Sequence, residues 1–236
     1  MKLLLDGWRH YLLEDKNKFP FQIYVDLDGV LVNFEGGVIK TINEDIEDPS
    51  RVEAKIKKLA ALLDPQTAKR RTKRLKKRHR AMLDRLYYLR ADDPKVVETD
   101  ISRNAEERGE MENTVRNYMY ERLQNDLDFW TNLEWLEPSY KEGQDGKKLW
   151  AHVKDMKPSP IILTAPMKGD PAGADHIGKR EWVKKHLGSH VEVIVIKDKW
   201  KYAIDDSGAQ NVLIDDTYSK VEPWRDQGGF AVHHTS

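Results

Sequence analysis

The sequence contains no cysteine, so it has no disulfide framework, no thiolate zinc site and no cysteine nucleophile. Long apolar runs are also missing: none approaches the ~18 residues that a membrane span needs, and the three leucines before Asp6 are too few for a signal peptide. Lys+Arg (40) balance Asp+Glu (40), which argues against a global attraction to nucleic acid or membrane. These absences favour a cytoplasmic protein without a membrane anchor.

The chain has 236 residues, of which 39% are hydrophobic and 34% charged. This composition is typical of a globular protein with one large core, or with one core and a smaller attached domain. The sequence leaves the oligomeric state, including a homodimer, open.

Strand and helix patterns divide the chain. An apolar strand at residues 23–25 is followed by helical periodicity from about Val38 to Leu89 and from about Glu106 to Asp128. Later segments alternate strands with helices, which predicts a parallel sheet covered on both faces. The later predicted strands are residues 161–163, 191–196, 212–214 and 230–232.

The predicted fold class is therefore α/β, with a Rossmann-like doubly wound parallel sheet and a helical cap inserted after the first strand. We expect residues 1–33 and 155–236 to form the core, with an amphipathic helix over residues 1–20, and residues 34–154 to form the cap.

Two aspartates follow the first strand, in "YVDLDGV". Residues two apart on a strand share a face, so Asp26 and Asp28 converge if strand geometry persists. In doubly wound sheets, ligands bind outside the carboxyl ends of the strands. Close carboxylates repel one another, so a hard divalent cation is the expected partner.

Other predicted strands end in residues that suit a phosphate site. "IILTAP" ends in Thr164, whose hydroxyl could bond a phosphoryl oxygen, and "VLIDD" ends in Asp215 and Asp216, a second acidic pair for the cation. "IVIKDK" ends in Lys197 and Lys199, which could neutralise an oxyanion.

This order of motifs resembles the haloacid dehalogenase superfamily, and its details resemble the 5′(3′)-deoxyribonucleotidase branch. The similar pieces are "VDLDGVLVNF", "ILTAP", "KREWVKKHLG", "IKDK" and "LIDD", which cover about half of the chain, while the insert is similar only at "DFWTNLEWLEP". The insert occupies the position of that superfamily's first-motif cap.

The resemblance implies roles for these residues. Asp26 would attack phosphorus, and Asp28 would act as general acid and then general base, as in the superfamily's phosphatases. Mg²⁺ would be held by Asp26, the backbone carbonyl of Asp28, and Asp215 with Asp216.

The resemblance also implies a phosphate pocket. Thr164 would bind the phosphoryl group, and Ala165 stands where relatives commonly carry a serine, which removes one hydroxyl. Of two candidate lysines, Lys199 matches the third-motif position better, and Lys179 would be a supplementary phosphate ligand.

The expected function is that of a Mg²⁺-dependent phosphomonoesterase acting on a small phosphorylated substrate. The substrate we expect is a nucleoside monophosphate. One alternative is a phosphatase for nucleic-acid terminal phosphates or another phosphoester. Another is a nucleic-acid-binding protein with a vestigial core, against which the intact motif set argues.

Two features of the insert bear on the substrate. The basic stretch "KRRTKRLKKRHR" (residues 69–80) could contact nucleic acid, or it could be a solvated helix face paired with neighbouring acidic residues. Phe34, Phe129 and Trp130 could stack a base or form the core of the cap. His233 and His234 are expected in a surface tail.

Overall fold

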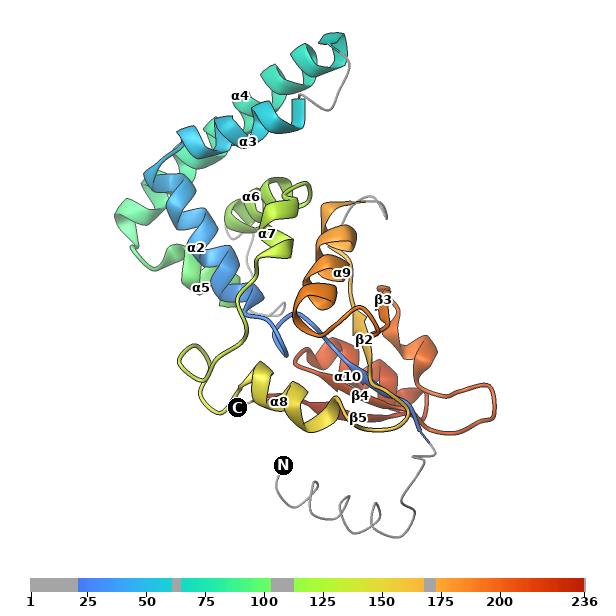
Figure 1. Ribbon diagram of the computed structural model, residues 1–236. Helices are drawn as coiled ribbons and strands as arrows, with labels where there is room; N and C mark the ends of the chain where they lie inside the picture. The colour runs from blue at the N-terminus through green and yellow to red at the C-terminus, as the bar shows by residue number, and fades with distance from the viewer. Residues whose placement is uncertain (1–20, 61–64, 103–112, 168–172, 236) are drawn as a thin grey trace. The chain divides into compact units, whose positions relative to one another are not determined.

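The computed structural model describes residues 21–60, 65–102, 113–167 and 173–235 (Figure 1). The predicted N-terminal helix over residues 1–20 lies outside these ranges. The described chain forms two compact units. The sheet unit comprises residues 21–33, 134–166 and 180–235, and the helical unit comprises residues 34–133 and 167–179.

The sheet unit contains five parallel strands in the order β3-β2-β1-β4-β5. Their β-branched and apolar residues suit strands that are covered on both faces. The order places β1 in the centre, between β2 and β4, as in a doubly wound sheet. The strands are β1 (Ile23–Val25), β2 (Ile161–Thr164), β3 (Val193–Val195), β4 (Val212–Asp215) and β5 (Phe230–His233).

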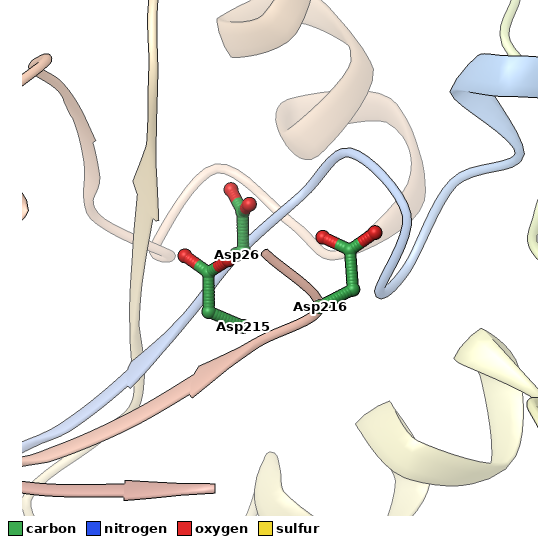
Figure 2. A group of neighbouring side chains, drawn as sticks. All are labelled: Asp26, Asp215 and Asp216. Atoms are coloured by element: carbon green, nitrogen blue, oxygen red, sulfur yellow. The ribbon is translucent and has the colours of Figure 1, made fainter. Parts of the chain in front are cut away.

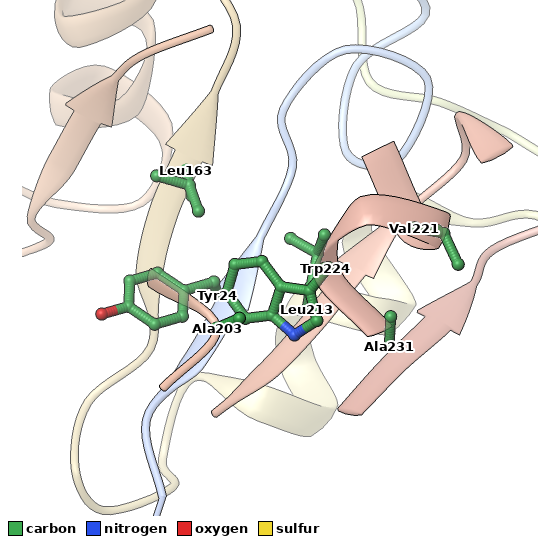
Figure 3. Close-up of a cluster of buried hydrophobic side chains, with 7 residues drawn as sticks. All are labelled: Tyr24, Leu163, Ala203, Leu213, Val221, Trp224 and Ala231. Carbon is green, nitrogen blue, oxygen red and sulfur yellow. The ribbon is translucent and has the colours of Figure 1, made fainter. Parts of the chain in front are cut away.

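One face of the sheet carries a cluster of buried side chains (Figure 3). Tyr24 packs edge-on against Trp224, with 5.6 Å between the ring centroids. Alternate strand residues point to the other face, where Ile23 and Val25 are also buried. The cluster comprises Tyr24, Leu163, Ala203, Leu213, Val221, Trp224 and Ala231.

Short helices lie between the strands of the sheet unit in chain order. Asp145 caps the start of the helix that precedes β2, accepting a hydrogen bond from Lys148 N at 2.9 Å. The helices are α8 (Gly146–Val153), the 3₁₀ helix η2 (Lys199–Tyr202), α10 (Tyr218–Asp226) and α9 (Ala174–His186), of which residues 174–179 belong to the helical unit.

The helical unit has a buried polar network. Arg122 donates to Asp45 at 2.6 Å and to Asp126 at 2.5 Å, and Tyr118 also donates to Asp45, at 2.9 Å. Lys55 completes the network at 2.6 Å from Asp126. The helices are α2 (Phe34–Glu47), α3 (Ser50–Ala60), α4 (Pro65–Asp92), α5 (Val96–Ser102), α6 (Asn113–Leu123) and α7 (Leu127–Thr131).

The observed division of the chain differs from the predicted cap at residues 34–154. The first junction falls at residue 34 as expected, but the chain returns to the sheet unit at residue 134. Backbone hydrogen bonds hold this return segment: Asn33 N donates to Glu134 O at 2.9 Å, and Leu136 N donates to Leu31 O at 2.8 Å. Residues 134–153, including α8, therefore belong with the sheet.

In the ranges that the structure describes, no helix combines the length and the apolar character needed to cross a membrane.

Candidate active site

A tight turn follows β1 and sets the direction of the first aspartates. Asp26 N donates to Ile214 O at 2.9 Å, which continues the pairing of β1 with β4, and Leu27 N donates to the Asp26 carboxylate at 2.7 Å. Gly29 then adopts a φ of +74°, which glycine accepts readily. The chain therefore turns back at the carboxyl end of the central strand.

Three carboxylates gather at this edge of the sheet (Figure 2). Asp26 follows β1, Asp215 ends β4 and Asp216 follows it. One carboxylate oxygen from each residue lies within 4.8 Å of the other two. Adjacent parallel strands bring their carboxyl ends together, so residues almost 190 positions apart share one site.

Lys199 lies between two of these carboxylates. Its Nζ is 2.8 Å from Asp26 Oδ1 and 2.7 Å from Asp215 Oδ2, and the residue is 1% exposed. Burial acts to lower the pKa of Lys199, but the neighbouring Asp26 and Asp215 outweigh it and raise the pKa overall. The site therefore contains a buried, charged ammonium group.

The ammonium group does not satisfy all three carboxylates. Burial, together with the nearby Asp26, raises the pKa of Asp215 to about 6. Burial and the charges of Asp26 and Asp215 raise the pKa of Asp216 to about 7. A further cation among these oxygens would relieve this repulsion and favour the ionised forms.

Gly29 leaves room for the Asp216 carboxylate. A Cβ atom added at Gly29 would lie 2.1 Å from Asp216 Oδ2, far inside van der Waals contact. The glycine is thus required twice: for its positive φ, and for the close approach of a carboxylate. Thr217 also contacts the acidic pair: its backbone N donates to Asp215 at 2.8 Å, and its Oγ1 donates to Asp216 at 3.3 Å.

The remaining predicted residues of the sheet unit lie at the same edge. Thr164 ends β2, next to β1, and is fully buried, with Ala165 directly after it. Asp28 is half-buried in the turn after β1, where it forms a bridge with Val32. The Asp28 side chain is not part of the three-carboxylate group, and the expected metal ligand at this position is its backbone carbonyl.

The other predicted residues belong to the helical unit. Lys179 is 1% exposed, and its Nζ lies 5.1 Å from the centroid of the Trp130 ring, a cation–π distance. Phe34 stacks on Trp130 with 5.4 Å between centroids, and Phe129 meets Phe34 edge-on at 6.1 Å. Trp130 itself is 1% exposed and donates to Leu123 O at 2.9 Å. Trp130 is thus a core residue of this unit, and Phe34 and Phe129 are the half-buried rings.

The expectation of a surface tail at His233 and His234 is wrong. His233 ends β5, and its Nε2 is 2.9 Å from the backbone oxygen of Asp216. His234 is 4% exposed, and its backbone N donates to Asp215 O at 2.8 Å. The pairing of β5 with β4 continues to the last residue of β4, so both histidines support the acidic pair. The apolar run of the sequence ends at Val232, so it did not indicate that the strand pairing continues through His233.

The donor set fits a hard divalent cation. Carboxylate oxygens are the ligands that Mg²⁺ prefers, and Mg²⁺ is typically held by one or two carboxylates together with water and substrate phosphate. Among the ion pairs of the described residues, Lys199 contacts Asp26 and Asp215 but not Asp216. The Asp216 carboxylate is therefore suited to bind such a cation. The site therefore combines a metal-compatible carboxylate group with a buried cation.

No protein-family model matches the chain, and no curated protein matches it. Among solved structures, it is similar to the crystal structure of a hydrolase from Streptococcus pneumoniae TIGR4. The alignment covers 92% of this chain and 95% of that one, with 13% sequence identity and a TM-score of 0.40. At these values the similarity does not define a function for this chain.

Proposed function

We propose that this protein is a Mg²⁺-dependent phosphomonoesterase of the haloacid dehalogenase type, with a nucleoside monophosphate as its substrate. The observation that carries the proposal is the group formed by Asp26, Asp215 and Asp216, with Lys199 buried against it, at the carboxyl ends of the central strands. The motif resemblance of the sequence supports the same reaction.

Mg²⁺ would be held by Asp26, the backbone carbonyl of Asp28, and Asp215 with Asp216. When bound, it would neutralise charge on the phosphoryl oxygens during displacement.

Asp26 is the proposed nucleophile. The hydrogen bonds from Leu27 N and Lys199 Nζ both reach Oδ1, so they fix the orientation of the carboxylate and direct Oδ2 as the attacking oxygen. Attack by Oδ2 forms a bond to phosphorus, and the bond from phosphorus to the leaving oxygen breaks. Asp28 gives its proton to that oxygen. The product of this step is an aspartyl-phosphate, which divides one difficult displacement into two easier ones.

The second step regenerates the carboxylate. Asp28, now ionised, takes a proton from a water molecule, and the water oxygen attacks phosphorus. The bond between phosphorus and Asp26 breaks, and inorganic phosphate leaves. Lys199 stays charged throughout and balances the negative charge of Asp26 and of the phosphoryl group. Thr164 and Ala165 would line the phosphate pocket.

The nucleotide assignment is supported by the resemblance to the deoxyribonucleotidase branch and by the half-buried rings of Phe34 and Phe129 in the helical unit. A base could stack on such rings. Lys179 is buried against Trp130 within the helical unit, and the supplementary phosphate role that the resemblance implies for it stays a prediction.

The proposal is tested by release of inorganic phosphate from a substrate panel. The panel contains deoxy- and ribonucleoside 5′- and 3′-monophosphates, phosphorylated oligonucleotides and sugar phosphates, each with Mg²⁺ and with chelator. We expect metal-dependent release from a nucleoside monophosphate and none from the Asp26→Asn variant. Preference for an oligonucleotide end would select the alternative substrate, and no release from any member would contradict the proposal.

A further inference from the structure

One face of α4 is strongly basic and exposed. Between Lys69 and Arg80 the helix has no acidic residue. A shallow groove of about 570 Å³ runs along this part of the helix. Its lining consists of Arg70, Lys73, Arg74, Lys77, Arg78 and Ala81, which we call the basic face.

The basic face is opposite the packed side of the helix. At 100° per residue, Arg70, Arg74 and Lys77 fall on one stripe, whereas the buried His79 and Leu86 fall on the other side. That other side packs against α3 and α6. Among the described residues, the basic face therefore lies away from the side of α4 that packs against α3 and α6.

Neighbouring acidic residues pair with Lys76, beside this face, and with one of its five cations, Arg78. Lys76 pairs with Glu53 at 2.8 Å, and Arg78 pairs with Glu121. Within the ranges that the structure describes, no carboxylate forms an ion pair with Arg70, Lys73, Arg74 or Lys77. The charges of these four residues are thus available to an external anion.

An exposed tyrosine continues the same stripe, and a second exposed tyrosine lies beside it. Tyr88 is five turns from Arg70 and on the same side, and it is 70% exposed. Tyr87 is 60% exposed and meets Tyr88 edge-on, with 5.9 Å between centroids. Asp84 and Arg85, which lie between, carry opposite charges. From Arg70 to Tyr88 the stripe is about 27 Å long at 1.5 Å per residue.

We propose that the basic face and the tyrosine pair of α4 bind single-stranded nucleic acid. Its cations repeat every three or four residues, or about 4.5–6 Å along the axis, and can follow a phosphate backbone. The tyrosines can stack on bases that are not paired. A membrane is a poorer match, because Ala81 is the only aliphatic side chain on this face, and membrane-surface helices carry an apolar side of Leu, Phe or Trp.

This inference does not depend on the proposed phosphatase activity, so its test avoids turnover. Fluorescence anisotropy would follow a labelled 20-nucleotide single strand binding to the full chain in chelator, over a series of salt concentrations. If four cations neutralise four phosphates, log K should fall with log salt with a slope of about −2.8.

The test variant replaces Arg70, Lys73, Arg74 and Lys77 with glutamine. Glutamine keeps the helix, since its helix propensity is close to that of Lys and Arg. The matched control replaces four exposed lysines of the sheet unit with glutamine. These are Lys154, Lys157, Lys184 and Lys185.

We expect the test variant to bind at least about tenfold more weakly at low salt with a slope near zero, and the control variant to bind like the wild type. Tyr87→Ala with Tyr88→Ala should weaken binding by about 5- to 100-fold with an unchanged slope. Equal losses in the test and control variants would overturn the proposal. So would competition by polyglutamate as effective as that of unlabelled strand, which would indicate an acidic protein partner. If the wild-type chain binds the single strand but releases no phosphate from any substrate, the proposed function is contradicted and the nucleic-acid site on α4 is not.

Discussion

Replacing Gly29 with alanine separates the two reasons for a glycine at this position. The residue has a φ of +74°, and an alanine there costs about 1–2 kcal/mol in backbone strain. For a chain of this length the expected decrease in Tm is about 2–8 °C. The new Cβ would also lie 2.1 Å from Asp216 Oδ2, whereas real contacts of this kind are not shorter than 3.0 Å.

The Asp216 carboxylate must therefore move by about 1 Å, and it can do so because it is the end of a side chain. A displacement of about 1 Å in a catalytic site can cost about 100-fold in rate. We expect Gly29→Ala to lose at least tenfold in Mg²⁺ affinity and about 100-fold in phosphate release, with a Tm change no larger than strain explains.

Gly208→Ala is the matched control. Gly208 has a φ of +86°, and a Cβ there would meet no atom within 4 Å. It should show a similar decrease in Tm with unchanged Mg²⁺ affinity by titration calorimetry and unchanged phosphate release. Wild-type Mg²⁺ affinity and activity in Gly29→Ala would show that the close approach of this glycine to Asp216 has no functional consequence.

Three further predictions concern buried charges. Lys199→Met leaves two buried carboxylates without their ammonium partner, so the free energy of unfolding in chelator should fall by about 3–5 kcal/mol. Mg²⁺ should then stabilise this variant more than it stabilises the wild type. Equal stabilisation of both proteins by Mg²⁺ would count against a shared site. Arg122→Met should lower the free energy of unfolding, measured in denaturant, by about 3–5 kcal/mol. Arg51→Met, which breaks an exposed ion pair, should lower it by less than about 1 kcal/mol. Similar losses in both variants would contradict a stabilising role for the buried network. Burial lowers the pKa of His79, with Arg122 acting in the same direction, so the unfolded chain binds this proton more readily and stability should decrease as the pH falls below about 6.5. His79→Leu should weaken this decrease, measured by denaturant unfolding between pH 7.5 and 5.5, and an unchanged profile would exclude His79 as the cause.

The sheet was predictable because its strands carry a local signal. Apolar, β-branched runs such as residues 23–25 and 212–214 became β1 and β4, and the chain order of strands and helices indicated a parallel sheet. The strand-end aspartates could be expected at one edge, since parallel strands bring their carboxyl ends together.

The end of the helical unit was not predictable in the same way. The segment after Leu133 returns to the sheet unit through backbone hydrogen bonds such as that from Leu136 N to Leu31 O. Such pairing joins residues about a hundred positions apart and depends on no side-chain pattern, so periodicity does not reveal it. The sequence also did not indicate the buried network of Arg122 and Asp45, because charged residues in helices are usually exposed.

The two candidate lysines show what three-dimensional placement adds. Both lie near apolar segments in the sequence, but Lys199 contacts Asp26 and Asp215, whereas Lys179 lies over Trp130 in the helical unit. The resemblance favoured Lys199 over Lys179 as the lysine of the proposed site, and that choice stays a prediction. The place of Trp130 in a core also required the structure, since an aromatic side chain near a motif can be a binding surface or a packing residue.

If Asp26 is the nucleophile, the protein forms a covalent phosphoenzyme that acid quenching can trap during turnover of a labelled phosphomonoester with Mg²⁺. We expect phosphate attached to the peptide that contains Asp26, removable by hydroxylamine and absent from Asp26→Asn. Phosphate release at the wild-type rate by Asp26→Asn, or steady turnover with no covalent phosphate at any quench time, would contradict this role of Asp26.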